Sequence, residues 1–392
     1  MEENIKFQSY KDKKDKLNFL MNPKVLEKTH FSGSTPPDIF FGSANYPDIN
    51  YGILSPQEIA DSSIMSSPEE WVGENLSIED IIRFRKQLVY AKNKDNIKNN
   101  RIKDLLQSLA VSSNPVSTEF FLAKKPLRTF EKSKFYPFMT NSAPLRKAVI
   151  EENVKVKKVV DYITSDYDLK SVGAVKELYS GNIETSHIQK IFSSGLLGLK
   201  KDRRIVPTKW AITAVDDIIG KEILKKIRFY PEIKDFMVFS DYYNGNQFEI
   251  FFLPGSFEFE VMEVGFPRGI HERQISFCHD YESIFGRKSY ASQVVGAYYA
   301  DRLATTEFLE KIKRQAKIIV FHEEREEYYA PLGVGIIRET IRRAMQKQPE
   351  IFATKEEALQ IIKSRLKLDF NEYLQKSVVL KNYGKQKRLW EF

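Results

Sequence analysis

Acidic side chains are the first candidates for chemistry in this sequence. Asp216 and Asp217 close the run that starts at Pro207, and Glu260 lies in an apolar stretch typical of a strand. Converging carboxylates can hold Mg²⁺ or act as a general base in phosphodiester chemistry. The two aspartates could equally stabilise the dipole of a helix N-terminus. Paired acids at helix starts are common, so this structural interpretation is preferred.

A stretch rich in Gly, Pro, Ser and Asn, from 31 to 76, is predicted to be a long loop, and such loops are often functional. Its glycines would let a phosphate or a base approach the backbone, and a tyrosine could stack on the base. If the chain is an enzyme acting on nucleotides or DNA phosphodiesters, we expect its site where this loop meets Asp216, Asp217 and Glu260. The candidate nucleotide-binding residues are Gly33, Gly42, Tyr46 and Asn50.

The segment 168–210 has the order of a winged helix, in which one helix enters the major groove and a wing meets the DNA backbone. Two short helices are predicted at 169–179 and 186–193, followed by a basic hairpin at 199–206. Such a hairpin would contact phosphates without reading sequence. The alternative is a solvated turn between packed elements, because basic turns are common. The candidate DNA-binding residues here are Lys200, Lys201, Arg203 and Arg204.

A second basic turn offers Arg287 and Lys288 to phosphate, although it is equally suited to solvent. Shortly before it, Cys278, His279 and Asp280 suggest a nucleophile beside a base. Neighbours in sequence point apart, so we do not expect these three residues to form a catalytic dyad. The sequence also contains no P-loop, G-x-S-x-G or H-E-x-x-H motif that would identify a reaction.

The last seven residues, from Gln386 to Phe392, have the pattern Q-x-x-L-x-x-F. In one helical turn residues three apart share a face, so Leu389 and Phe392 could enter one apolar pocket while the Gln386 amide bonds at its edge. The pattern resembles the sliding-clamp binding motif, or PIP box, although Trp390 stands inside the turn and a second terminal aromatic is absent. A flexible tail at 381–392 would bury these side chains in a partner, or alternatively dock them on its own domain.

The sequence has 392 residues, 42% of them hydrophobic and 13% aromatic, enough for two or three packed units. Its 61 Lys and Arg against 53 Asp and Glu give a net charge of +8, which permits nucleic-acid binding. The one cysteine, Cys278, excludes an internal disulfide and a cysteine-based zinc site. We find no transmembrane run and no signal peptide, and we therefore expect a cytoplasmic protein without a membrane partner.

The clearest strand pattern lies at 236–263, where Asn244 and Gly245 form the preferred type I′ hairpin turn and a later Pro-Gly pair leads into a third strand. We predict an antiparallel meander with a further strand at 317–322, in an α+β fold whose helices pack on a central antiparallel sheet. The predicted domains are a basic arm at 1–30, a loop-rich region at 31–150 with a helix at 77–92, an α+β core at 151–380, and the tail.

Several long motifs follow one another in a specific order, from about residue 33 to the end of the sequence. Together they resemble the archaeal Nre family of DNA repair proteins. The resemblance implies a DNA damage-response protein that the sliding clamp PCNA recruits to DNA. The motifs are Ser34–Gly42, Tyr46–Asn50, Ser67–Trp71, Ile81–Arg85, Ser194–Gly198, Val206–Asp217, Gly286–Ala291, Ala297–Ala300 and the terminal clamp motif.

The family typically carries an N-terminal four-cysteine module, proposed to be a zinc finger. This chain has a Lys-rich arm there instead, so we expect no zinc and no DNA contact through such a module. The resemblance brings no established reaction with it. Two interpretations therefore stay open: a clamp-tethered repair factor that binds DNA without a cofactor, or an enzyme that would use Mg²⁺.

Overall fold

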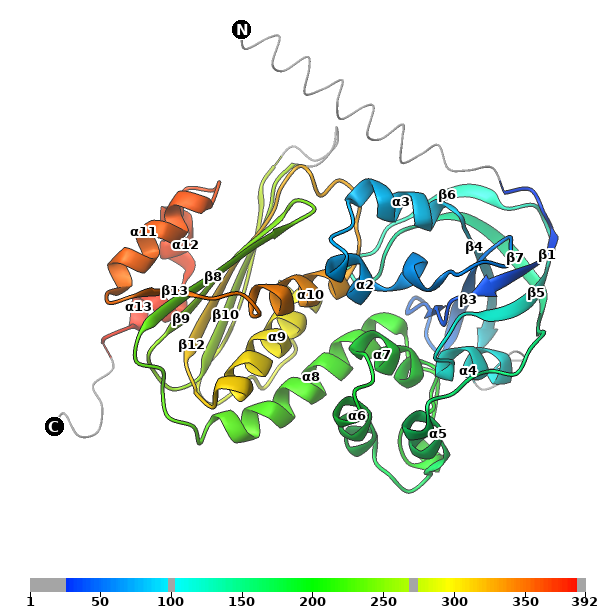
Figure 1. Cartoon of the computed structure of the whole chain (residues 1–392), viewed down its shortest axis with the longest axis horizontal. Helices are drawn as coiled ribbons and strands as arrows, with labels where there is room; N and C mark the ends of the chain where they lie inside the picture. The colour runs from blue at the N-terminus through cyan, green and yellow to red at the C-terminus, as the bar shows by residue number, and fades with distance from the viewer. Residues whose placement is uncertain (1–25, 98–102, 268–273, 386–392) are drawn as a thin grey trace, which may run out of the picture. The chain divides into compact units, whose positions relative to one another are not determined.

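The computed structural model describes residues 26–97, 103–267 and 274–385, which form two compact units (Figure 1). Unit 1 extends to Ile219 and includes Ala330–Ile336; unit 2 comprises Gly220–Tyr329 and the residues from Ile337 onward. Both units combine helices with a mixed sheet, which confirms the α+β class. None of the described helices combines the length and the apolar character needed to cross a membrane.

The sheet of unit 1 has the strand order β1-β5-β7-β4-β3-β2, with β6 paired to β7. Its strands are His30–Thr35 (β1), Ile39–Phe41 (β2), Asp48–Pro56 (β3), Leu88–Asn96 (β4), Val116–Leu122 (β5), Leu127–Glu131 (β6) and Met139–Ile150 (β7). Neighbouring strands are antiparallel except β4 and β7. One face of the sheet packs on Leu106 and Leu109 of α4 (Lys103–Val111), whereas Phe40, Leu54 and Met65 belong to a second apolar cluster.

The prediction of a loop at 31–76 is wrong for the first half of this stretch, which contains β1, β2 and β3. Within β3, Ile49, Tyr51 and Ile53 pack into one apolar cluster, whereas Leu54 packs into a different one. Alternation with period two is the pattern of a strand, and it outweighs a composition rich in Gly, Ser and Asn. The candidate nucleotide-binding residues in this stretch are therefore strand and turn residues of the sheet.

The helices of unit 1 agree in part with the prediction. They are η1 (Ser63–Ser66), α2 (Pro68–Gly73), α3 (Ile78–Lys86), α4, α5 (Lys158–Ser165), α6 (Ser171–Ser180) and α7 (Thr185–Ser193). The helix predicted at 77–92 ends at Lys86, and its last apolar residues belong to β4. The expected hairpin at 199–206 is also wrong: Lys200–Asp202 form a short 3-10 helix (η2) and no strand occurs in that segment, so the winged-helix interpretation lacks its wing.

The sheet of unit 2 has the order β11-β10-β12-β9-β8-β13. Its strands are Phe236–Tyr243 (β8), Asn246–Leu253 (β9), Glu258–Gly265 (β10), Ser276–Glu282 (β11), Lys317–Glu324 (β12) and Glu350–Phe352 (β13). The β8–β9 hairpin is confirmed, with Asn244 and Gly245 at φ 47° and 88°. These positive φ values are why Asn and Gly are preferred at this turn.

The meander breaks after β9, because β12 lies between β9 and β10. It runs antiparallel to β9 and parallel to β10. A parallel neighbour needs a crossover connection, and here the chain passes through β11 and α9 (Gly296–Ile312) before it returns as β12. The central sheet is therefore mixed rather than purely antiparallel.

Helices cover both faces of the unit 2 sheet (Figure 1). On one face α11 (Lys355–Arg365), α12 (Phe370–Lys376) and α13 (Val378–Asn382) pack against Phe251 and Phe321. On the other face the Phe308 ring of α9 lies 5.4 Å from that of Phe252. Strands covered on both faces read as unbroken apolar runs, which is why β9 and β10 are buried at every position.

Two helices and the C-terminal residues complete the fold. Both α8 (Thr208–Ile227) and α10 (Val334–Ala344) contribute residues to unit 1 and to unit 2. The first residues of the predicted tail belong to α13 and a following turn, where the Tyr383 ring lies 5.9 Å from that of Phe236. The predicted clamp-binding residues Gln386, Leu389, Trp390 and Phe392, like most of the basic arm, lie outside the described residues.

Candidate DNA-contact and carboxylate sites

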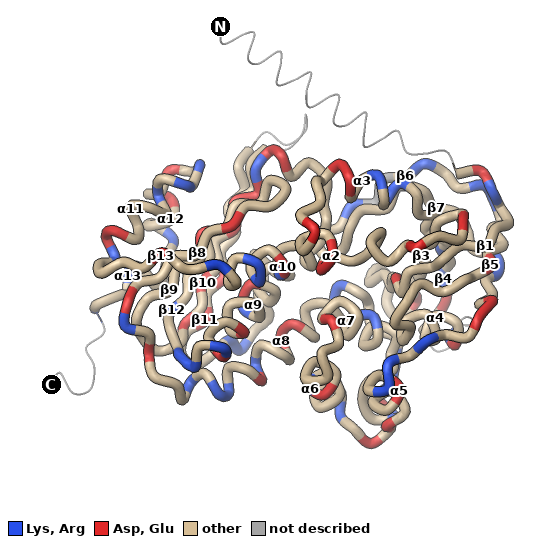
Figure 2. Tube along the Cα trace, in the orientation of Figure 1, with Lys and Arg blue, Asp and Glu red and all other residues tan. Residues whose placement is uncertain are grey.

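Lys and Arg residues are spread over both units and interspersed with acids (Figure 2). In the basic segment after α7, Arg203 donates hydrogen bonds to the carbonyl oxygens of Gly198 and Thr164, at 2.8 and 2.6 Å. A third bond reaches the carbonyl of Asp166. The guanidinium also lies 4.4 Å from the Tyr167 ring centre, and burial lowers the pKa of Arg203. Arg203 therefore holds the segment in place, and a phosphate would have to compete with these bonds.

The other basic residues of this segment are more accessible. Lys200, Lys201 and Arg204 are exposed, and the Lys200 ammonium lies 5.7 Å from the centre of the Tyr167 ring. Without a hairpin these side chains do not project from a wing. Phosphate contact through them remains a prediction, now from a compact turn rather than from an extended ribbon.

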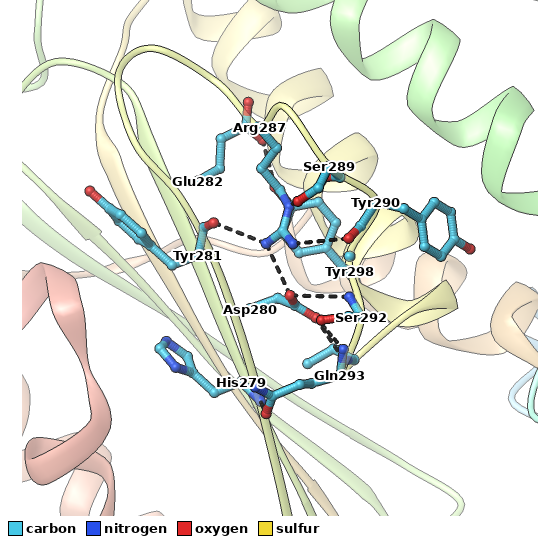
Figure 3. Close-up of polar contacts among 12 residues, drawn as sticks. His279, Asp280, Tyr281, Glu282, Arg287, Ser289, Tyr290, Ser292, Gln293 and Tyr298 are labelled. Atoms are coloured by element: carbon cyan, nitrogen blue, oxygen red, sulfur yellow. Dashed lines mark hydrogen bonds and ion pairs between the residues drawn. The ribbon is translucent and has the colours of Figure 1, made fainter.

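The second basic turn, after β11, is built around the carboxylate of Asp280 (Figure 3). The backbone N–H groups of Ser292, Gln293 and Val294 donate to it at 3.3, 3.0 and 2.8 Å. Arg287 completes the set, with Nη1 3.0 Å from Asp280 Oδ1. Consecutive N–H groups around one anion form a nest, an arrangement that elsewhere binds phosphate. In this protein the buried Asp280 is itself the anion in the nest.

Arg287 directs its remaining donors to the backbone of the same turn (Figure 3). They reach the carbonyl oxygens of Tyr281, Tyr290 and Ser289 at 3.0, 3.2 and 3.3 Å. The guanidinium carbon lies 5.1 Å from the Tyr298 ring centre. Arg287 is thus a positioning residue, and the phosphate contact predicted for it would compete with these bonds. The neighbouring lysine is the exposed cation of the turn.

A second buried carboxylate, that of Glu282 at the end of β11, is bound by side chains of α9. The Tyr298 hydroxyl donates to Glu282 Oε2 at 2.6 Å, and Arg302 Nη1 lies 2.9 Å from the same oxygen. Burial, followed by the nearby Glu282 charge, raises the pKa of Tyr298, so its hydroxyl stays protonated and continues to donate. Strand β11 and the start of α9 are therefore joined by ionic and hydrogen-bonded pairs on both sides of the turn.

The predicted catalytic aspartates lie within a helix rather than at its start. Since α8 begins at Thr208, Asp216 and Asp217 are more than two turns inside it, and the N-terminal dipole interpretation is wrong. Asp216 is completely buried and accepts a hydrogen bond from Gln189 Nε2 at 2.9 Å, which links α8 to α7. The burial and this bond indicate a structural role for Asp216.

Glu260, the third predicted catalytic acid, is completely buried in unit 2. Its carboxylate accepts hydrogen bonds from the His279 ring at 2.7 Å, from Ser377 Oγ at 2.5 Å and from the backbone N–H of Val378 at 2.6 Å. It therefore holds the start of α13 against β10. His279 bonds to Glu260 and Asp280 to the backbone of the following turn, and the expectation that residues 278–280 form no dyad stays a prediction.

Within unit 1, the predicted nucleotide-binding residues contact their own sheet and the start of α8. A side chain on Gly33 would begin 2.0 Å from the Pro56 carbonyl oxygen, so this glycine permits close strand packing. Gly42 N–H donates to the Asn50 carbonyl at 2.7 Å. The Tyr46 ring lies 5.3 Å from that of Trp210, so this stretch does meet the first turn of α8. In the described part of the chain, no three His, Cys, Asp or Glu are grouped to hold a metal ion.

Sequence reasoning missed a buried ionic cluster in unit 1. Arg85 of α3 is 1% exposed, and its Nη1 lies 3.4 Å from Asp38 Oδ2 and 3.1 Å from Ser66 Oγ. Lys190 of α7 lies 3.6 Å from the other oxygen of Asp38. Burial lowers the pKa of Arg85, and the Asp38 carboxylate opposes this effect. The cluster joins α3 and α7 to the turn between β1 and β2.

The signal that could have revealed this cluster lies in two sequence motifs. Asp38 belongs to the motif Ser34–Gly42 and Arg85 to Ile81–Arg85, and both motifs are otherwise largely apolar or small. A charge inside a buried segment must be paired, because an isolated buried ion is strongly unfavourable. The two motifs thus meet in space, although no local pattern states which charge pairs with which.

Two protein-family models match the sequence of this chain. The model of the archaeal Nre N-terminal region matches residues 14–272, and that of the archaeal Nre C-terminal region matches residues 282–392. The chain belongs to the archaeal Nre family. The interval between the two family regions, residues 273–281, contains most of β11, and the N-terminal family region includes β8, β9 and β10 of the unit 2 sheet.

Relatives match over most of their length. "DNA repair protein NreB" of Archaeoglobus fulgidus is 33% identical over 375 residues, 95% of this chain and 94% of the relative. "DNA repair protein NreA" of the same organism is 32% identical over 350 residues, 88% and 87% of the two chains. "DNA repair protein NreA" of Haloferax volcanii is 31% identical over 326 residues, 80% and 78%. No solved structure matches this chain.

Proposed function

We propose that this protein is a DNA repair factor that the sliding clamp PCNA recruits to DNA through its terminal Q-x-x-L-x-x-F. The repair role is supported by the relatives, which are named DNA repair proteins and which align with 80 to 95% of this chain. The observation that carries the recruitment is the terminal pattern itself, in which Gln386, Leu389 and Phe392 recur every third residue. One helical turn brings these three side chains to a single face.

The packing of the residues before the motif is consistent with this proposal. Val379 is buried, and the Lys355 ammonium lies 5.9 Å from the Tyr383 ring centre, so the chain is anchored to unit 2 just before the motif. Truncation after Lys385 removes none of these anchoring residues. We expect a roughly micromolar dissociation constant, because a short segment that becomes ordered on binding loses conformational entropy.

The test is a calorimetric titration of the full chain with the sliding clamp. The variant Leu389→Ala/Phe392→Ala should weaken binding by at least about 50-fold, since neither truncated side chain can fill the apolar pocket. Glu391→Ala is the matched control, because residue 391 does not share a face with 389 and 392. Unchanged affinity after truncation at Lys385 would contradict the proposal, and an unchanged unfolding midpoint would show that the truncated protein is still folded.

DNA contact is the second part of the proposed function, and it rests on Lys200, Lys201 and Arg204 as sequence-tolerant phosphate contacts. Reversing the charge at Lys201 and Arg204 should weaken binding to duplex DNA and lower its dependence on salt, because fewer counterions are released. Lys363→Glu reverses one charge at an exposed position of α11 and is the control for each of the two single reversals. Arg203 is left intact because its guanidinium is bonded to backbone carbonyls of the protein. Identical salt slopes in all these variants would exclude the segment from DNA contact.

Two of the three carboxylates predicted to carry the enzymatic alternative give it no support, whereas the third, Asp217, is only half-buried on α8. Asp216 and Glu260 are completely buried and are engaged in hydrogen bonds that join elements of the fold. A general base or metal ligand has to reach its substrate. We therefore propose the clamp-recruited repair factor alone.

A further inference from the structure

Two phenylalanine side chains of unit 2 lie almost entirely in solvent. Phe229 follows α8 and is 89% exposed, and Phe285 stands in the turn after β11 and is 86% exposed. Among the described residues they are the two most exposed large apolar side chains. A single exposed ring needs no explanation, but exposed rings that share a surface with cations indicate a ligand.

The two rings belong to stretches of the chain that are neighbours in space. Arg228 Nη2 lies 3.6 Å from the point where a side chain on Gly286 would begin. Arg228 directly precedes Phe229, and Gly286 directly follows Phe285. The proximity of the arginine to the glycine therefore joins the end of α8 to the turn that carries the second ring.

Cations accompany both rings. Arg228 and Lys288 are exposed, and within the described ranges neither forms an ion pair or a side-chain hydrogen bond. Figure 2 shows further basic residues along the last turns of α8; of these, Lys225 is paired with Glu222 and Lys226 with Glu310. The nearby Glu282 is buried and paired with Arg302, so it does not neutralise the surface. The surface thus offers unpaired positive charge beside two aromatic faces.

The turn that carries Phe285 is also held firmly. The Gly286 N–H donates to the Ser283 carbonyl at 2.8 Å, and the Asp280–Arg287 pair fixes the residues that follow. The chain thus uses a buried ion pair to present a ring that itself contacts little of the protein. A side chain on a fixed turn loses little freedom when a ligand covers it, so its contact contributes more fully to affinity.

We propose that Phe229 and Phe285, together with Arg228 and Lys288, bind single-stranded DNA by stacking on unpaired bases. A phenyl ring stacks on any base, and flanking cations bind the phosphates, which is how sequence-tolerant single-strand sites are built. In a duplex the base faces are already stacked and out of reach. A protein partner that covered the rings by apolar contact alone would bury the two cations without a counter-charge, which is unfavourable.

This inference shares with the proposed function the premise that the chain works on DNA, but it does not involve the clamp motif. The test is fluorescence anisotropy of a labelled oligothymidylate of about 20 nucleotides, titrated with the full chain in the absence of the clamp. The variant Phe229→Ala/Phe285→Ala should bind at least about tenfold more weakly for each ring removed. Ile351→Ala, which removes an apolar side chain 60% exposed on β13 at the opposite edge of the sheet, should bind as the parent does.

Conservative variants separate stacking from apolar contact. Phe229→Leu/Phe285→Leu should lose as much affinity as the alanine variant, whereas Phe285→Trp should retain it, because only an aromatic face stacks on a base. Arg228→Ala/Lys288→Ala should lower the slope of log affinity against log salt by about 1.4, or about 0.7 for each phosphate that the variant no longer neutralises. If the leucine variant retained its binding, the contact would be apolar rather than stacking, and the proposal would be overturned.

Two further outcomes would also overturn it: equal affinity of the parent for single-stranded and duplex DNA, or undiminished single-strand binding by the alanine variant. The clamp-motif variant Leu389→Ala/Phe392→Ala should bind the oligonucleotide as the parent does. Single-strand binding without clamp binding would therefore refute the recruitment while leaving this inference intact. Clamp binding without single-strand binding would refute this inference and leave the recruitment intact.

Discussion

The two basic turns of this protein, one in each unit, share a plan but differ in their anchors. In each turn an arginine donates to backbone carbonyls and lies over a tyrosine ring, Arg203 over Tyr167 and Arg287 over Tyr298. Only Arg287 also faces a buried carboxylate, that of Asp280. Sequence alone treats the turns as equivalent phosphate-binding candidates, but the structure gives their arginines a positioning role.

The difference shows how the cations of a basic turn divide their tasks. Arginine has five donors in a rigid fork and can satisfy several carbonyls at once, whereas lysine carries a point charge on a flexible stem. The arginine therefore holds the turn and the lysines stay in solvent. Where a buried carboxylate is added, as in unit 2, the turn becomes costlier to disrupt, and it is this turn that presents an exposed ring.

The largest expected effect comes from removing the anchored arginine. Arg287→Ala should destabilise unit 2 by about 3 kcal/mol, because Asp280 would keep its N–H donors but lose its cation in a buried site. Native-state hydrogen exchange of β10 and β11 measures this loss. Lys288→Ala is the matched control and should change stability by less than about 0.5 kcal/mol. If Arg287→Ala and Lys288→Ala destabilised unit 2 equally, Arg287 would not be the anchor of this turn.

Protonation should act on unit 1 in acid. His187 of α7 is buried and donates from Nε2 to the Ala110 carbonyl at 3.0 Å, and burial lowers its pKa to about 4. The unfolded chain, with an ordinary histidine pKa of about 6.5, binds a proton earlier as the pH falls. The free energy of unfolding should therefore decrease by about 2 kcal/mol between pH 7.5 and pH 5. Denaturant titrations of the parent and of His187→Gln at the two pH values measure this contribution. If the free energy of unfolding fell by the same amount in both proteins, the contribution of His187 would be rejected.

Unit 2 should respond to pH in the opposite sense through Glu249 of β9. Burial raises its pKa to about 7, while Ser240 at 2.7 Å and Arg365 at 3.4 Å oppose the shift. The folded state thus keeps a proton that the unfolded chain releases above a pH of about 4.5, so this contribution is lost as the pH rises through 7. From pH 5 to 7.5 we expect a loss of about 2 kcal/mol, absent in Glu249→Gln. Native-state hydrogen exchange at the two pH values measures the stability of each unit. If both units changed in stability in the same direction with pH, the predicted opposite responses would be wrong.

The smallest expected effect is at the turn without a carboxylate. Arg203→Ala should destabilise unit 1 by about 1 kcal/mol, since Thr164 and Asp166, two of the three residues whose carbonyls lose their donor, are only half-buried and water can replace it. Arg204→Ala, at the exposed neighbouring position, should have almost no effect. Thermal unfolding of the two variants is a sufficient measurement. A loss from Arg203→Ala as large as that from Arg287→Ala would show that the carboxylate is not what distinguishes the turns.

Local patterns predicted the short elements better than the sites. The two helices before the basic segment and the β8–β9 hairpin follow from apolar periodicity and from Asn244-Gly245, which act within a few residues. The strands at 31–52 were missed because composition was weighed above alternation. The burial of the candidate carboxylates could not be predicted: whether Asp216 or Glu260 faces solvent depends on elements distant in sequence, and a sequence pattern does not state burial.

The sequence by itself determined the family, the α+β class, and features whose partners lie close by, such as the capping box of Thr354 and Glu357. Only the tertiary structure decided that β12 separates β9 from β10 and that Glu260 holds a helix start 118 positions away. It also decided that Asp280 binds N–H groups 12 to 14 residues onward. Partners of this kind are selected by packing and by the need to satisfy buried charges, and both depend on the whole fold.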